Sequence, residues 1–185
     1  INGAGNTFNG GILINAKSAR YETAALTINN VNFNTTSLND VKVDACIRLG
    51  ASGDNSTRYA NNITVSGCSF TGTDDKIVAV KSYTGGDWNL TIKDCVVSKG
   101  MHSLAQLANV EKGLVITGCK VFSKNGINLN NTPTATISDC TFNVKGYAIR
   151  VGVKGSVNAE VPLTVVNTSG FNLPQTGDYG TWMFT

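Results

Sequence analysis

Leu90-Thr-Ile-Lys-Asp-Cys95 is one copy of a six-residue phrase that recurs along this 185-residue chain. Most copies read apolar, polar, apolar, then two turn-forming residues or their equivalents, then a small side chain. The copies are Leu26–Val31, Ile63–Cys68, Leu90–Cys95, Leu114–Cys119, Ala135–Cys140 and Leu163–Thr168. A phrase that returns every few tens of residues is typical of stacked units, none of which can bury a core alone.

A second strand-like segment follows each of the first five phrases. Its apolar residues alternate with a period of two, which predicts the inward pairs Ile47/Leu49, Val78/Val80, Ile127/Leu129 and Ile149/Val151. Two residues after the small position, the side chain is again large and apolar, as in Phe33, Phe70, Val97, Val121 and Phe142. Two-sided coils of this kind stack into a parallel β-helix, with backbone hydrogen bonds between coils.

The sequence therefore predicts an all-β fold, a parallel β-helix of roughly six to seven coils, with residues 1–185 as a single domain. The distance between successive small positions varies from 21 to 37 residues, so the extra residues are expected in loops. A leucine-rich repeat is disfavoured because the units lack its leucine spacing and any helical stretch. A β-sandwich would not place the small residue at the same point of every repeating unit.

Four of the five cysteines, Cys68, Cys95, Cys119 and Cys140, occupy the small position of the phrase. This regularity, with an odd total, argues against a disulfide framework. We expect a buried, reduced column in which each thiol acts as a compact hydrophobic group. The chain has no Cys-x-x-Cys pair and a single histidine, His102, so neither a zinc site nor any other cofactor is expected.

Charge and hydropathy exclude several classes of partner. The net charge is +3, but the basic residues are scattered, so nucleic acid is not an expected partner. No apolar run is long enough to cross a membrane. The chain starts at Ile1 without a signal peptide, which we interpret as a mature or excised fragment.

The repeat and its variable loops resemble the right-handed parallel β-helix proteins of the pectate-lyase-like superfamily. That group includes polysaccharide-degrading enzymes, phage tailspikes and bacterial surface adhesins. The resemblance covers nearly the whole chain, and it implies a fold more than a function.

The segment Thr73–Ser82 is similar to the Gly-Asp-Asp-Cys-Ile-Ala-Ile-Lys-Ser segment of polygalacturonases, and His102 follows at a place comparable to that family's Gly-His-Gly. The resemblance implies Asp74, Asp75 and His102 as catalytic candidates for inverting glycoside hydrolysis, which needs a carboxylic acid and a second carboxylate. Thr73 replaces the family's glycine, and both glycines beside His102 are missing. A lyase is disfavoured, because the acidic residues do not converge on a calcium site.

Two long insertions hold candidate ligand-binding residues. Tyr83 and Trp88 lie in one glycine-rich loop, where their rings either stack on sugar rings or cover the edges of the coils, and Arg58 lies in the other insertion. Trp182 is expected to cap the end of the solenoid instead.

Leu173-Pro-Gln-Thr-Gly177 resembles the Leu-Pro-x-Thr-Gly sorting signal of Gram-positive wall proteins. The resemblance implies covalent cell-wall attachment at Thr176. The alternative is that residues 173–185 form a C-terminal cap, with Pro174 ending the last coil.

These observations favour a non-catalytic, extracellular β-helix that is secreted or held at a bacterial cell surface. It would act as an adhesin or carbohydrate-binding module, with a carbohydrate or a host-cell ligand as partner. The alternatives are a polysaccharide-degrading enzyme and a segment of a phage fibre or tailspike.

Overall fold

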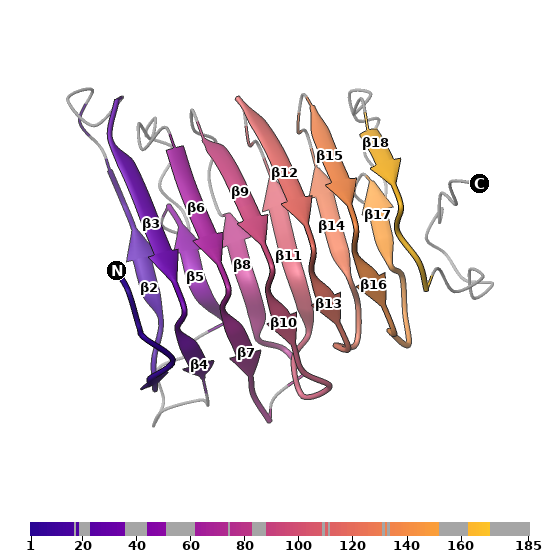
Figure 1. Ribbon diagram of the computed structural model, residues 1–185, viewed down its shortest axis with the longest axis horizontal. Helices are drawn as coiled ribbons and strands as arrows, with labels where there is room; N and C mark the ends of the chain where they lie inside the picture. Colours follow the sequence, from indigo (N-terminus) through magenta and orange to yellow (C-terminus); the bar gives the residue numbers. More distant parts are fainter. Residues whose placement is uncertain are drawn as a thin grey trace.

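The computed structural model describes residues 1–16, 18, 23–35, 44–50, 62–73, 75–82, 88–108, 110, 112–130, 132, 134–151 and 163–170. The described residues form eighteen strands and no helix. The strands make three parallel sheets of six, one strand from each coil (Figure 1). The predicted parallel β-helix is confirmed, with about six coils.

The first sheet contains the recurring phrase, with the strands β3 (Ala25–Asn29), β6 (Asn62–Ser66), β9 (Asn89–Lys93), β12 (Gly113–Thr117), β15 (Ala135–Ser138) and β18 (Leu163–Val166). The second contains β1 (Thr7–Phe8), β4 (Asn32–Asn34), β7 (Ser69–Thr71), β10 (Val96–Val97), β13 (Lys120–Val121) and β16 (Thr141–Phe142). The third contains β2 (Ile12–Ile14), β5 (Ala45–Leu49), β8 (Val78–Ser82), β11 (Ser103–Ala108), β14 (Ile127–Asn130) and β17 (Ile149–Val151). We call them the phrase sheet, the short sheet and the third sheet.

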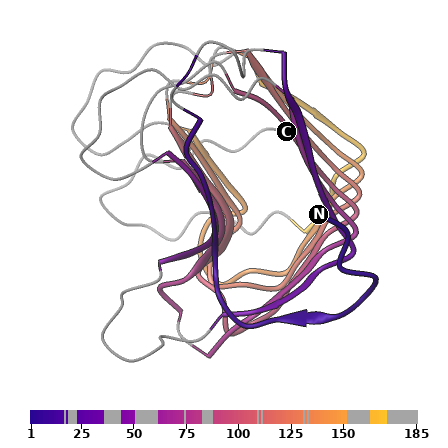
Figure 2. The ribbon, with the colours of Figure 1, turned by 90° about the vertical axis from the view of Figure 1, so that its left-hand side faces the viewer.

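The expectation of a two-sided coil is wrong, because each coil has three sides. Viewed along the long axis, the coils superpose around a three-sided cross-section (Figure 2). The corner between the phrase sheet and the short sheet is a single residue with positive φ in every coil. These residues are Asn30, Gly67, Asp94, Gly118, Asp139 and Asn167, with φ between 45° and 65°. Glycine, Asn and Asp are the residues that adopt this left-handed conformation most readily, so the chain turns there and starts a separate strand.

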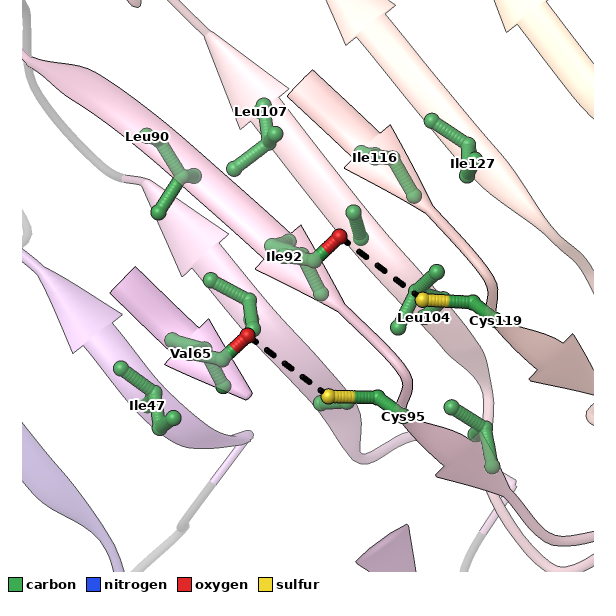
Figure 3. Packing of buried hydrophobic residues seen from close by; sticks show 14 of the residues in the cluster. Ile47, Val65, Leu90, Ile92, Cys95, Leu104, Leu107, Ile116, Cys119 and Ile127 are labelled. Carbon is green, nitrogen blue, oxygen red and sulfur yellow. Dashed lines mark hydrogen bonds between the residues drawn. The ribbon is translucent and has the colours of Figure 1, made fainter. Parts of the chain in front are cut away.

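The cysteine column follows directly after this corner, and the expectation that it is buried and reduced is confirmed. All five cysteines are buried and free. Each column thiol lies within donor distance of a carbonyl of the preceding coil, such as Cys95 Sγ to Val65 O and Cys119 Sγ to Ile92 O, both 3.8 Å (Figure 3). The column packs among isoleucine and leucine side chains from the phrase and third sheets (Figure 3).

Aromatic rings extend the core toward the N-terminal coil. Phe33 and Phe70 are stacked, with centroids 5.2 Å apart, and Phe8 meets Phe33 edge to face at 5.8 Å. Phe8 is on β1, which pairs with β4, so the N-terminal segment is part of the solenoid.

Candidate functional site

The structure describes three of the six residues that the sequence proposed for catalysis or ligand binding. Asp75, His102 and Trp88 are described, whereas Asp74, Tyr83 and Arg58 lie outside the described residues. Thr176, the proposed attachment point, and the whole segment 173–185 also lie outside them.

Trp88 is fully buried, with an exposed fraction of 0%. The expectation that its ring stacks on a sugar is therefore wrong. Trp88 immediately precedes β9, and its carbonyl accepts a hydrogen bond from the amide of Lys112 in the next coil at 3.0 Å. Trp88 belongs to the buried hydrophobic core and does not form a binding platform.

Asp75 and His102 lie at the same corner of the solenoid, between the short sheet and the third sheet. The His102 amide donates to the carbonyl of Ile77 at 2.7 Å, and its own carbonyl accepts from the amide of Asn125 at 2.8 Å. Three successive coils are thereby stacked at this corner. Lys124, next to Asn125, donates to Asp75 Oδ2 at 2.8 Å. We call Asp75, His102, Lys124 and Asn125 the corner cluster.

The charge state of Asp75 does not suit a general acid. The hydrogen bond and the positive charge of Lys124 lower the pKa of Asp75 below its usual value. The carboxylate is therefore ionised at neutral pH and has no proton to give to a leaving group. This observation weakens the catalytic role that the polygalacturonase resemblance implies for Asp75.

His102 is a neutral group held by amides and a hydroxyl. Its Nδ1 lies 3.1 Å from Ser103 Oγ and 3.2 Å from Gln106 Nε2, and its Nε2 lies 3.4 Å from Asn125 Nδ2. Burial lowers the pKa of His102, and the charge of Lys124 lowers it further, while Asp75 opposes both. The imidazole therefore serves as a fixed hydrogen-bonding group at neutral pH.

A row of polar side chains runs beside the corner cluster, on the outer face of the third sheet. Its five members are paired from strand to strand in the sheet register: Arg48 on β5, Lys81 on β8, Gln106 on β11, Asn128 on β14 and Arg150 on β17. We call this row the polar ladder. Its members are partly exposed, whereas their neighbours in four of the five strands are buried on both sides. Strand spacing places one polar group about every 4.8 Å along the solenoid.

Hydrogen bonds connect the polar ladder internally and to the corner cluster. Arg150 Nε donates to Asn128 Oδ1 at 3.1 Å, and the Arg150 guanidinium lies 4.7 Å from the centre of the Tyr147 ring. Gln106 Nε2 lies 3.2 Å from His102 Nδ1 in the corner cluster. The ladder and the cluster therefore form one continuous polar surface across the coils of β5 to β17.

The polar ladder was not predicted, although its signal is present in the sequence. Each ladder residue stands between two inward residues, as Arg48 does between Ile47 and Leu49, and Asn128 between Ile127 and Leu129. Once the inward pairs are assigned, the residue between them must point outward. Aligning these intervening positions from coil to coil identifies the polar ladder.

This surface offers hydrogen-bond donors and acceptors, and within the described residues it offers one carboxylate in the corner cluster. No group of three His, Cys, Asp or Glu side chains among those residues is arranged to hold a metal ion. No helix among the described residues is long and apolar enough to cross a membrane. The polar ladder thus presents polar side chains in a row that crosses five strands of the third sheet.

Comparison with models of protein families, with curated proteins and with solved structures found no match for this chain. The class that the fold defines is the parallel β-helix solenoid.

Proposed function

We propose that this chain is a non-catalytic, extracellular binding protein, an adhesin or carbohydrate-binding module, that holds an extended polysaccharide along the polar ladder. The observation that carries the proposal is the register of the ladder, which gives one polar side chain per coil over five successive coils. A ligand that repeats along its length meets a hydrogen-bond donor at each step. Planar amides and guanidinium groups match the hydroxyl and ring oxygens of such a polymer.

The neutral centre of the ladder provides the sharpest test. Replacing both amides, as in Gln106→Ala with Asn128→Ala, removes two sets of hydrogen bonds at roughly 0.5 to 1.5 kcal/mol each. We expect the affinity for a polysaccharide identified on a glycan panel to fall about tenfold or more, measured by titration calorimetry. Undiminished affinity in the double variant would refute a role for the ladder.

A matched control exists on the opposite surface. Thr91 and Thr136 point outward from β9 and β15 of the phrase sheet, and they can be replaced by alanine together. This pair leaves the third sheet untouched, so its affinity should equal that of the wild type. Circular dichroism on both double variants checks that the solenoid is intact.

A polysaccharide-degrading enzyme is the second candidate, because Asp75 and His102 are close enough to perturb each other's titration at one corner. The ionised state of Asp75 argues against it. We expect no new reducing ends from a panel of polysaccharides. Turnover by the wild type that disappears in the Asp74→Asn/Asp75→Asn variant would establish the glycosidase instead.

We also propose attachment to a Gram-positive cell wall through Thr176, on the strength of the Leu173–Gly177 motif alone. Incubation with a sortase and a labelled oligoglycine should transfer the label to Thr176, detected by peptide mass spectrometry. The Thr176→Ala variant is the control. If the wild type is not labelled, residues 173–185 have a different role.

A further inference from the structure

The backbone of the cysteine column advances by one strand spacing per coil. The carbonyls of Cys68, Cys95 and Cys119 each accept a hydrogen bond from the amide that follows the cysteine of the next coil, all at 2.9 Å. The residues after the column cysteines are also paired in register in the short sheet. Successive members of the column are therefore about 4.8 Å apart.

The four side chains of the column adopt the same orientation. Each Sγ atom lies 3.1 to 3.4 Å from the carbonyl oxygen two residues before it. It also lies 3.7 to 3.9 Å from a carbonyl oxygen at one equivalent position of the preceding coil. Figure 3 shows the side chains of Cys95 and Cys119 pointing the same way. The sulfur atoms therefore repeat with the backbone, one in each coil.

Thiols of neighbouring coils are within hydrogen-bond reach of each other. A hydrogen bond with the Cys95 thiol lowers the pKa of Cys68 to about 7, and one with the Cys119 thiol raises the pKa of Cys140. Four thiols in such a row make three neighbouring pairs, from Cys68 to Cys140.

We propose that the cysteine column binds soft monovalent cations, Cu(I) or Ag(I), each held in line between the sulfur atoms of two neighbouring coils. Thiolate sulfur is the ligand that selects Cu(I). A metal–thiolate bond is about 2.3 Å long in zinc proteins, so two in line span about 4.6 Å, close to one strand spacing of about 4.8 Å. These cations accept two sulfur ligands in a line, so three converging ligands are not needed. The inference is independent of the proposed function.

Binding leaves the column uncharged. As each cation enters, one S–H bond breaks and its proton leaves to solvent. Two metal–sulfur bonds form, one to the new thiolate and one to a lone pair of the neighbouring sulfur. Three cations thus replace three protons, and the fourth thiol keeps its proton. This balance matters because the column lies in the hydrophobic core, where an added net charge would be costly.

Native mass spectrometry of the reduced full chain tests the proposal, with Ag(I) as the first probe because it needs no reductant. Glutathione in the buffer competes for ions held by single thiols. We expect three Ag(I) per chain and a higher melting temperature, because the cations bind the folded state. X-ray absorption should find two sulfur neighbours for each ion. Cu(I), added without oxygen, should give the same count.

Replacement of single cysteines by valine, which occupies the column position in the first phrase, predicts a series of counts. Cys140→Val removes the end of the column and should leave two Ag(I). Cys95→Val removes a member of two pairs and should leave one, between Cys119 and Cys140. Cys46→Val is the matched control, because Cys46 is equally buried but the register of β5 and β8 places Ala79 beside it. This variant should still bind three.

Several results would overturn the inference. Equal losses from Cys95→Val and Cys140→Val would mean that each thiol binds its own ion. A loss from Cys46→Val would mean that any buried thiol is sufficient. A lower melting temperature with Ag(I) would place the ions on the unfolded chain, and no retained ion would exclude the site. Circular dichroism checks folding, and Cys119→Val, which also interrupts two pairs, repeats the prediction if Cys95→Val does not fold.

Discussion

The backbone of Gly100 lies so close to the carbonyl of Gly72 in the preceding coil that position 100 has no room for a side chain. A Cβ atom built on Gly100 would overlap the Gly72 oxygen and carbonyl carbon. His102 follows two residues later, and its amide is bonded to Ile77 of the same preceding coil. This glycine contact therefore sets how closely the coils approach at the corner cluster.

Replacement of Gly100 by alanine should destabilise the protein by at least about 1 to 3 kcal/mol, because the new methyl group meets backbone atoms that cannot move independently. Gly5→Ala is the comparison. Gly5 has a positive φ of 80°, yet a Cβ atom added there would have nothing within 4 Å of it. The loss of stability in Gly5→Ala should therefore reflect the strained backbone conformation alone, and it should be about 1 kcal/mol. Urea unfolding should show the larger loss for Gly100→Ala, and a smaller loss would show that the coils separate there at little cost.

An acidic side chain in the cysteine column should prevent folding or come close to it. Cys95 is fully buried, and Cys95→Asp would place a carboxylate among apolar side chains with no cation beside it in the column. Cys95→Val should be tolerated, because Val31 occupies the equivalent position in the first phrase. Thermal unfolding compares the two variants. Similar melting temperatures would contradict the inward assignment.

Trp88 should be shielded from solvent whether or not a ligand is present. In a Trp182→Phe background, acrylamide should quench Trp88 fluorescence weakly in the folded protein and strongly in urea. Trp88→Ala should cost about 3 to 5 kcal/mol, as expected for a large buried aromatic residue. Trp88→Phe should cost much less, because the indole Nε1 has no hydrogen-bond partner among the described residues. Strong quenching in the folded state would restore Trp88 as a surface candidate.

The low pKa of His102 predicts that the protein loses stability as the pH falls below 6.5, the value of an unperturbed histidine. Between that pH and the lower folded-state pKa, the unfolded chain binds a proton that the folded chain does not. Acidification therefore favours unfolding, and the loss levels off once the folded protein is protonated too. Urea midpoints measured from about pH 7.5 to about pH 5 should show this decline, and His102→Gln should flatten it. A decline of equal slope in the variant would assign the effect to other groups.

The fold could be predicted from the sequence because the phrase contains both a strand of the phrase sheet and the corner that follows it, and this combination recurs in every coil. The inward pairs, such as Ile47 with Leu49, and the cysteine column follow from alternation alone. The third side of the coil was missed, because a left-handed bend at Asn30 or Asp94 is indistinguishable in sequence from an ordinary turn. Trp88 was misassigned because its neighbours Gly85, Gly86 and Asp87 are typical of exposed loops, whereas its burial depends on the coils stacked around it.

The candidate site was less accessible to sequence reasoning than the fold. Lys124 and Asp75 are 49 residues apart in the chain, and Lys81 and Asp44 are 37 apart. Neither pair belongs to a motif, and both arise because coils of unequal length are brought into the same register. Only the spatial superposition of the coils shows which charges face each other.

The unequal length of the coils has a consequence for how this surface can change over generations. Residues added to a loop leave every row in place, whereas the duplication of one whole coil would add a single member to each row at the same pitch. Neighbouring members of the polar ladder are therefore always one strand spacing apart, about 4.8 Å. The ladder's length along the solenoid axis depends on the number of coils and is independent of the number of residues in each coil.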